Sequence, residues 1–137
     1  YGGAGNDTIF GGYGSDSIEG EDDDDLLYNG TGSDTVSGDA GNDTLWGGAG
    51  MDLLSGGTGN DLFAFVAGNG DDTVTGFSPS DDTVDLSGTT FDFTNFSDVQ
   101  AQSQDLGGNL LIDLGGGDTL TLTGIAIGSL ASDDFVY

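Results

Sequence analysis

A nine-residue period runs through the first half of this chain, with glycine, aspartate and a large apolar residue at fixed offsets. Four copies fit GGxGxDxUx, where U is large and apolar: 2–10 (GGAGNDTIF), 11–19 (GGYGSDSIE), 47–55 (GGAGMDLLS) and 56–64 (GGTGNDLFA). Copies 29–37 (NGTGSDTVS) and 38–46 (GDAGNDTLW) each lack one glycine, and copy 20–28 (GEDDDDLLY) lacks two. Seven consecutive copies in one frame indicate a fold built from stacked repeats.

The last three residues of each repeat predict a β-strand. Segments such as 8–10 (TIF) and 44–46 (TLW) are rich in β-forming residues, and alternate facing along a strand turns U inward. The other six residues, with glycines at the first, second and fourth positions, are expected to form a tight turn. Two repeats then make one coil with strands in two opposed parallel sheets. The predicted core is the stack of U residues: Ile9, Ile18, Leu27, Val36, Leu45, Leu54 and Phe63.

The charge of the chain restricts its partners. It has 25 acidic residues and no Lys, Arg or His, which gives a formal net charge of -25. Phosphate binding needs cationic side chains, so nucleic acid is excluded and an anionic membrane surface is disfavoured. There is no Cys for disulfides or thiolate sites. A disordered acidic linker is the alternative, but linkers do not keep an apolar residue at a strict offset.

Stacking brings acidic side chains together without a positive partner. Each loop lies on the loop two repeats later, about one strand spacing (~4.8 Å) away, so that Asp16 approaches Asp34. A hard divalent cation that takes carboxylate and carbonyl oxygens would relieve the repulsion, and calcium suits such an all-protein site better than magnesium. Zinc and copper would need imidazole or thiolate, which the chain lacks. The alternative for each regular Asp is an Asx turn without metal.

The pattern becomes irregular toward the C-terminus. Segment 67–75 (AGNGDDTVT) still matches after a two-residue insertion at 65–66, and 77–85 (FSPSDDTVD) is expected to form the last turn of the coil. Beyond it, Asn95 is predicted to cap a helix over 96–104, with strands over 109–114 and 119–123 around the turn 115–118 and a final strand over 135–137. We therefore divide the chain into a coil, 1–86, and a capping segment of the same domain, 87–137.

These repeats resemble the RTX family, specifically the C-terminal β-roll of secreted serralysin-type proteases, lipases and alginate epimerases. The stretches NDLFAFVAGNGDDTVTGFSPSDDTVDLSG and NLLIDLGGGDTLTLTG look like the segments that close such rolls. The resemblance implies an all-β fold, a parallel β-roll (two-sheet right-handed β-solenoid) with a C-terminal β-rich cap. It also implies an uncleaved secretion signal at the acidic and apolar end, 133–137.

The resemblance further implies a ligand rule for calcium. One loop supplies the carbonyls of its second and fourth residues and its Asp, and the next stacked loop supplies those of its first and third residues and its Asp. On one edge the rule joins Gly12, Gly14 and Asp16 to Asn29, Thr31 and Asp34; Gly30, Gly32 and Asp34 to Gly47, Ala49 and Asp52; and Gly48, Gly50 and Asp52 to Ala67, Asn69 and Asp72.

On the opposite edge, the best site joins Asp39, Gly41 and Asp43 to Gly56, Thr58 and Asp61. The other sets are Gly3, Gly5 and Asp7 with Gly20, Asp22 and Asp25; Glu21, Asp23 and Asp25 with Gly38, Ala40 and Asp43; and a terminal set, Gly57, Gly59 and Asp61 with Phe77, Pro79 and Asp82. The resemblance thus implies about seven calcium ions, within a range of five to eight. Segment 21–25 has an alternative interpretation as a solvated acidic bulge.

The two outer faces should differ, because successive strands belong to alternate sheets. Only one face carries an aromatic column, Phe10, Tyr28 and Trp46. We expect this column to be covered by the C-terminal segment or by another part of a larger protein. A surface for glycans or for self-association is the alternative.

Together these features predict a calcium-binding module and not an enzyme. It would fold on binding calcium outside a bacterial cell, follow an upstream domain of a parent protein, and engage the type I secretion machinery through its C-terminus. A calcium-dependent adhesion or polysaccharide-binding module is the first alternative. A carboxylate-pair enzyme is the second, but its candidate acids are already assigned as ligands.

Overall fold

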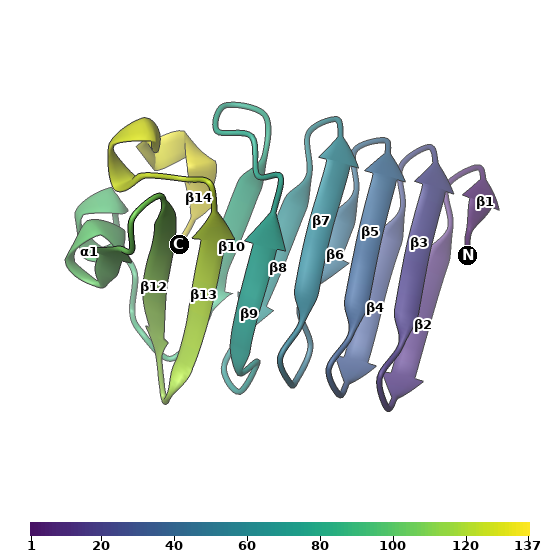
Figure 1. Cartoon of the computed structure of the whole chain (residues 1–137), viewed down its shortest axis with the longest axis horizontal. Coiled ribbons are helices and arrows are strands. Elements are labelled where there is room, and N and C mark those ends of the chain that lie inside the picture. The colour runs from purple at the N-terminus through teal and green to yellow at the C-terminus, as the bar shows by residue number, and fades with distance from the viewer.

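The computed structural model describes residues 1–137 as a solenoid of two facing sheets (Figure 1). The elements are β1 Gly3–Ala4, β2 Thr8–Tyr13, β3 Ser17–Asp22, β4 Leu26–Thr31, β5 Thr35–Ala40, β6 Thr44–Trp46, β7 Leu53–Thr58, β8 Leu62–Val66, β9 Asp71–Thr75, β10 Thr83–Gly88, α1 Phe96–Ala101, β11 Ser103–Asp105, β12 Asn109–Gly115, β13 Asp118–Thr123, η1 Ile127–Ser129, η2 Ser132–Asp134 and β14 Phe135–Val136. The first sheet has the order β1-β3-β5-β7-β9-β13-β12-β11, and the second has the order β14-β10-β8-β6-β4-β2. The predicted fold class is confirmed.

The register of the strands follows the repeat. Ile9 pairs with Leu27 and Ile18 pairs with Val36, so each strand lies on the strand two repeats later. The U residues form one buried stack, with Leu27, Leu45 and Phe63 fully inaccessible to solvent and Ile9 partly buried at the open end. The stack is the roll's core because a two-sheet solenoid has no other interior.

The strands are longer than expected, and the prediction that six residues of each repeat form a turn is wrong. Strand β2 runs through Gly11 and Gly12 to Tyr13, and its parallel pairing with β4 continues to Gly12↔Gly30. The first glycine stays outside the left-handed region, and the second, with φ 100° at Gly12, redirects the chain without ending the pairing. The turn proper is confined to the fourth to sixth positions, where Gly14 has φ 109°.

The irregular repeats continue the same coil. After the insertion, Leu54 pairs with Val74, and Phe63 pairs with Val84 on the other sheet. Both predicted continuations, 67–75 and 77–85, are therefore confirmed as strands of the roll. The inserted residues at 65–66 lengthen β8, and Phe65 is buried and joins the core.

The C-terminal segment closes the far end of the roll (Figure 1). The hairpin β12–β13 extends the first sheet beyond β9, and β14 pairs with β10 at the end of the second sheet. Asn95 caps α1 by accepting the Ser97 N–H at 2.9 Å, as predicted. The helix is shorter than the expected 96–104, because Gln102 accepts the Asp113 N–H and β11 then joins β12. No helix has the length and apolar character needed to span a membrane.

Candidate metal centre

One hydrogen bond recurs along both edges of the roll. The backbone N–H of each loop Asp donates to Oδ1 of the Asp one coil further on. The distances lie between 2.7 and 3.1 Å for the pairs Asp7 to Asp25, Asp16 to Asp34, Asp25 to Asp43, Asp34 to Asp52, Asp43 to Asp61, Asp52 to Asp72 and Asp61 to Asp82. This bond fixes the orientation of each carboxylate and leaves Oδ2 as its second oxygen.

That second oxygen is buried and has no hydrogen-bond partner in six consecutive loops. The residues are Asp16, Asp25, Asp34, Asp43, Asp52 and Asp61. A buried carboxylate oxygen without a partner costs several kcal/mol unless a cation or donor meets it. Because the chain has no Lys, Arg or His, no side chain can supply that positive charge. A cation held between the loops is therefore the natural partner.

Burial raises the pKa of several loop aspartates. Burial raises the pKa of Asp43 from 3.8 to about 6, with further contributions from the charges of Asp61 and Asp25. Burial likewise raises the pKa of Asp72 to about 7, despite the N–H bond from Asp52. Without metal, Asp43 and Asp72 therefore hold their protons at pH values above the ordinary range of an aspartate.

Backbone oxygens complete the environment of the carboxylates. The first glycine of a repeat faces its own Asp and the first carbonyl of the next loop. A Cβ placed on Gly2 would lie 2.6 Å from the Gly20 oxygen and 2.9 Å from Asp7 Oδ2. Calcium prefers carboxylate and carbonyl oxygens, so the oxygens around the first glycine are suitable calcium ligands. No three carboxylates converge in one place, so any site here would rely on carbonyl oxygens as well as on its two aspartates.

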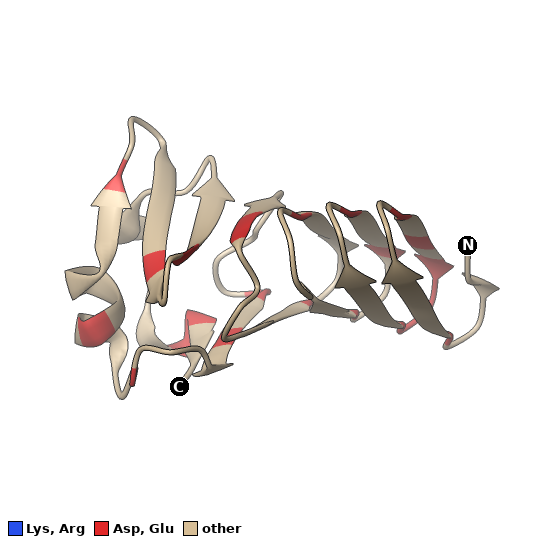
Figure 2. Cartoon of the chain, turned by 90° about the horizontal axis from the view of Figure 1, so that it is seen from below, with Lys and Arg blue, Asp and Glu red and all other residues tan.

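The structure places the predicted site residues in two rows of loops at opposite edges of the roll. Acidic residues lie at the turns of successive coils (Figure 2). One edge brings together Asp16, Asp34, Asp52 and Asp72, and the other brings together Asp7, Asp25, Asp43, Asp61 and Asp82. The assignment of individual carbonyls to individual ions stays a prediction.

The degenerate repeat keeps the path of its neighbours. Glu21 and Asp23 adopt φ angles of 81° and 78°, as the glycines at these positions do elsewhere, and Glu21 pairs with Asp39. The side chains at 21–24 are exposed, whereas Asp25 is 4% exposed and points inward. Asp23 Oδ2 accepts the Gly5 N–H at 3.1 Å. The turn is therefore formed despite its missing glycines.

The last loops differ from the rest. Both oxygens of Asp82 already accept N–H groups, from Ser78 at 2.8 Å and from Asp61 at 3.1 Å. This arrangement makes the terminal set with Phe77 and Pro79 the least favourable of the predicted cation sites.

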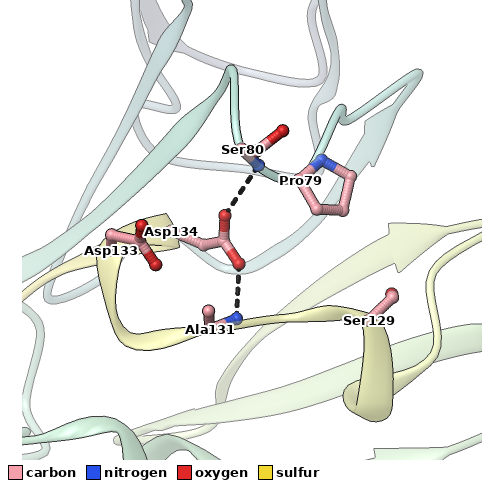
Figure 3. Close-up of a pocket in the computed structure, with 6 residues that line it drawn as sticks. All are labelled: Pro79, Ser80, Ser129, Ala131, Asp133 and Asp134. Atoms are coloured by element: carbon pink, nitrogen blue, oxygen red, sulfur yellow. Dashed lines mark hydrogen bonds between the residues drawn. The ribbon is translucent and has the colours of Figure 1, made fainter.

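Asp118 and Asp134, which were not predicted as site residues, lie at the C-terminal ends of the two rows of loops. Asp118 accepts the Gly68 N–H at 2.7 Å and the Gly70 N–H at 3.2 Å. Asp134, 2% exposed, accepts the Ser80 N–H and the Ala131 N–H beside a pocket lined by Pro79, Ser129 and Asp133 (Figure 3). The segment GGGDTL at 115–120 repeats the Gly-x-Asp-Thr-Leu pattern of 41–45 and was the available signal for Asp118. No comparable signal marks Asp134.

The aromatic column forms a ladder on the outer face of the second sheet. The rings of Phe10 and Tyr28 stack at 4.9 Å with 4° between their planes, and Tyr28 and Trp46 stack at 5.8 Å with 19°. Phe10 is 70% exposed, so the C-terminal segment does not cover this end of the ladder, and cover by another part of a larger protein stays a prediction. This stacking covers both faces of Tyr28 and one face each of Phe10 and Trp46. Glycan binding and self-association stay predictions.

Comparison with known families agrees with the geometry of the loops. The model of the RTX calcium-binding nonapeptide repeat (4 copies) matches residues 1–36 and 28–63. A search of curated proteins gave no match.

Solved structures share the fold over most of this chain. The AlgE6R3 subunit from the Azotobacter vinelandii mannuronan C5-epimerase is 27% identical, with a TM-score of 0.67 over 90% of this chain and 78% of that one. The AlgE6R2 subunit of the same enzyme is 26% identical, with a TM-score of 0.67 over 94% and 91%. The extracellular lipase LipA from Serratia marcescens is similar in fold alone, at 18% identity and a TM-score of 0.59 over 96% of this chain and 38% of the lipase.

Proposed function

Because the chain belongs to the family of RTX calcium-binding nonapeptide repeats, we propose that it is a calcium-dependent folding module that supports the type I secretion and folding of a larger protein. The observation that carries this proposal is the series of six buried Oδ2 atoms without a partner. Each lies beside a backbone turn rich in carbonyl oxygens, and calcium is the physiological cation that such oxygens suit best.

The charge of the chain explains why folding would depend on calcium. With a net charge of -25 and no cationic side chain, the chain repels itself in any compact state. Where calcium is scarce, as inside a cell, this repulsion favours the unfolded chain, which can be exported. Outside, binding at affinities of about 10⁻⁴ to 10⁻³ M adds its free energy to that of folding.

The proposed module has no catalytic role of its own. The buried carboxylates are arranged as cation ligands, and each is held by an N–H bond from the preceding coil. A hydrolase would need a pair of carboxylates across an open cleft. Catalysis in the parent protein would then belong to another domain.

Circular dichroism during a calcium titration tests this proposal. We expect little β structure in chelator, a cooperative gain of β structure as calcium is added, and reversal by chelator. Magnesium at the same concentrations is the control and should produce much less folding, because it prefers to keep its waters. Full β structure in excess chelator would refute the folding switch.

A second candidate function is calcium-dependent binding of an acidic polysaccharide. The observation that favours it is the similarity to two subunits of a mannuronan C5-epimerase over at least 90% of this chain. Since this chain has no cationic residue, calcium would have to bridge the two anionic partners. Sedimentation of the folded chain with a uronate polymer, at calcium concentrations above those needed for folding, should then show association that weakens as calcium is lowered. No association at any calcium concentration would exclude this candidate.

A further inference from the structure

The two rows of loops differ in what fills the space between successive coils. At the edge that carries Asp7, Asp25, Asp43 and Asp61, the space beside the first residue of each repeat is lined by oxygens. The atoms nearest a Cβ on Gly20 would be Asp25 Oδ2 and the Gly38 oxygen, and on Gly38 they would be Asp43 Oδ2 and the Gly56 oxygen. The Oδ2 atoms of Asp25, Asp43 and Asp61 have no hydrogen-bond partner in these spaces, and a cation would satisfy them.

At the other edge, the first such space follows the same rule. A Cβ on Gly11 would contact the backbone oxygen of Asn29 and would lie 3.1 Å from Asp16 Oδ2. The next space is different, because the repeat begins with Asn29 instead of glycine. The Asn29 side chain is fully buried, and its Nδ2 donates to the Gly47 oxygen at 2.8 Å. Gly47 is one of the carbonyl ligands that the family rule assigns to this space.

The bond to Gly47 fixes the orientation of the Asn29 amide. The Gly47 carbonyl can only accept a hydrogen bond, so the NH₂ group of Asn29 must point toward it. The amide oxygen is left buried without a partner.

A second asparagine fills the following space. Asn69 is 1% exposed, and its Nδ2 lies 3.5 Å from Asp72 Oδ2. The same Nδ2 is the atom nearest to the position that a Cβ on Gly47 would take. Its Oδ1 accepts the Val66 N–H at 3.0 Å. Because Val66 N–H can only donate, the orientation of this amide is also fixed, and its NH₂ group faces the carboxylate.

We propose that Asn29 and Asn69 act as built-in substitutes for calcium at two of the three intervals on this edge, where their amide N–H groups bond the Gly47 oxygen and Asp72 Oδ2, two oxygens that would otherwise bind an ion. This inference rests on the proposed calcium-binding function and refines it. Ions then fill the opposite edge and the interval between Asp16 and Asp34, while the intervals that Asn29 and Asn69 enter bind weakly or not at all. The two edges would therefore respond to different calcium concentrations.

Isothermal titration calorimetry with calcium tests this inference on three variants of the full chain. Asn29→Gly restores the glycine of the repeat, and Asn69→Ala removes the second amide. Asn60→Gly is the matched control, because Asn60 is exposed and its side chain makes no hydrogen bond. Each of the first two variants should bind one further ion at calcium concentrations that saturate the wild type, and the control should match the wild type.

A local readout comes from Trp46, the residue directly before Gly47 and the only tryptophan of the chain. Terbium luminescence excited through Trp46 should increase in Asn29→Gly relative to the wild type, and it should not change in Asn60→Gly. Circular dichroism at saturating calcium identifies a variant that has lost its fold, and the other variant then still tests the inference.

Wild-type calcium binding with unchanged stoichiometry in both variants would overturn this inference alone. Loss of an ion in Asn29→Gly would also overturn it, because the amide oxygen would then be a ligand. Absence of calcium binding in the wild type would overturn the proposed function together with the inference.

Discussion

At the scale of single residues, the loop aspartates determine what the roll can bind. In the five loops from Asp25 to Asp61, the aspartate uses Oδ1 to accept an N–H from the preceding coil, and its Oδ2 is buried without a hydrogen-bond partner. An aspartate in the middle of a row therefore faces two intervals at once. Its replacement should affect more than one ion.

Asp43→Asn tests this dual role. We expect the variant to raise the calcium concentration at the midpoint of folding about tenfold or more, a loss of ~1.4 kcal/mol or more of binding free energy. Asparagine keeps the acceptor for the Asp25 N–H but removes the negative charge. The matched control is Asp92→Asn, an exposed carboxylate without a hydrogen bond, which should leave the midpoint in place. Equal midpoints for the two variants would contradict the role of Asp43.

The pH dependence of the calcium-free chain follows from the raised pKa values. Asp43 and Asp72 titrate at about 6 and about 7 in the folded chain, against 3.8 ordinarily. The folded state binds more protons than the unfolded state between these values, so their contribution to stability is complete below 3.8 and is lost as the pH rises through 6 to 7. In chelator, β structure measured by circular dichroism should therefore increase from about pH 8 to about pH 5.

The same protonation should oppose calcium. Ligand carboxylates must be ionised to bind a metal, so the calcium concentration at the folding midpoint should rise as the pH falls over this window. A midpoint that stays constant between about pH 8 and about pH 5 would show that these carboxylates are not ligands.

At the scale of strands and loops, the inward stack stabilises the roll independently of the loops. Leu45 is fully buried at the centre of the second sheet, whereas Leu53 on the first sheet points outward and is 43% exposed. Leu45→Ala should lower the free energy of unfolding of the calcium-loaded chain by about 2 to 5 kcal/mol. Leu53→Ala, the matched control, should change it by no more than about 0.5 kcal/mol. Denaturant unfolding at saturating calcium measures both, and similar losses would contradict the inward assignment.

The repeat was sufficient to predict the strands, their register and the inward residues. The positions of glycine and aspartate determine where the chain turns, and the position of the apolar residue determines which side chain points inward. It did not predict how far the strands extend. The sequence pattern suggested that Gly11 and Gly12 break the strand, but the parallel pairing with the neighbouring coil holds them in it. Local glycine preference is overridden there by hydrogen bonds that only the stacked coils provide.

Contacts far apart in the sequence were also beyond prediction. Asn29 and Asn69 were considered only for their backbone carbonyls, since the motif does not indicate where a side chain at these positions points. Asp118 meets Gly68 across 50 residues, and Asp134 meets Ser80 across 54. Such pairs depend on how the cap docks, which no repeat encodes.

At the scale of the whole molecule, hydrogen bonds between the cap and the last loops close the C-terminal end of the roll. Asp118 and Asp134 each accept backbone N–H groups from the last loop of their edge. The cap continues both sheets, and its apolar residues join the same core as the repeats. Solenoids need such an end because the last coil would otherwise expose its core.

Asp118→Asn tests the closure at one edge. The amide can accept only one of the two N–H bonds from Gly68 and Gly70, so the calcium-loaded chain should lose about 1 to 3 kcal/mol of unfolding free energy. Asp105→Asn is the control, because Asp105 also accepts N–H groups from two glycines, Gly107 and Gly108, but in an exposed turn. Thermal unfolding at saturating calcium should show a lower transition temperature only for Asp118→Asn.

The central claim is that the buried Oδ2 atoms of the loop aspartates are calcium ligands. An anomalous difference map from a crystal of the calcium-loaded chain tests it most directly. We predict peaks at opposite edges of the roll, each between two stacked loops and each contacted by aspartates one coil apart, such as Asp25 and Asp43. Peaks confined to the exposed acidic surface at 21–24, with none between the loops, would contradict the claim.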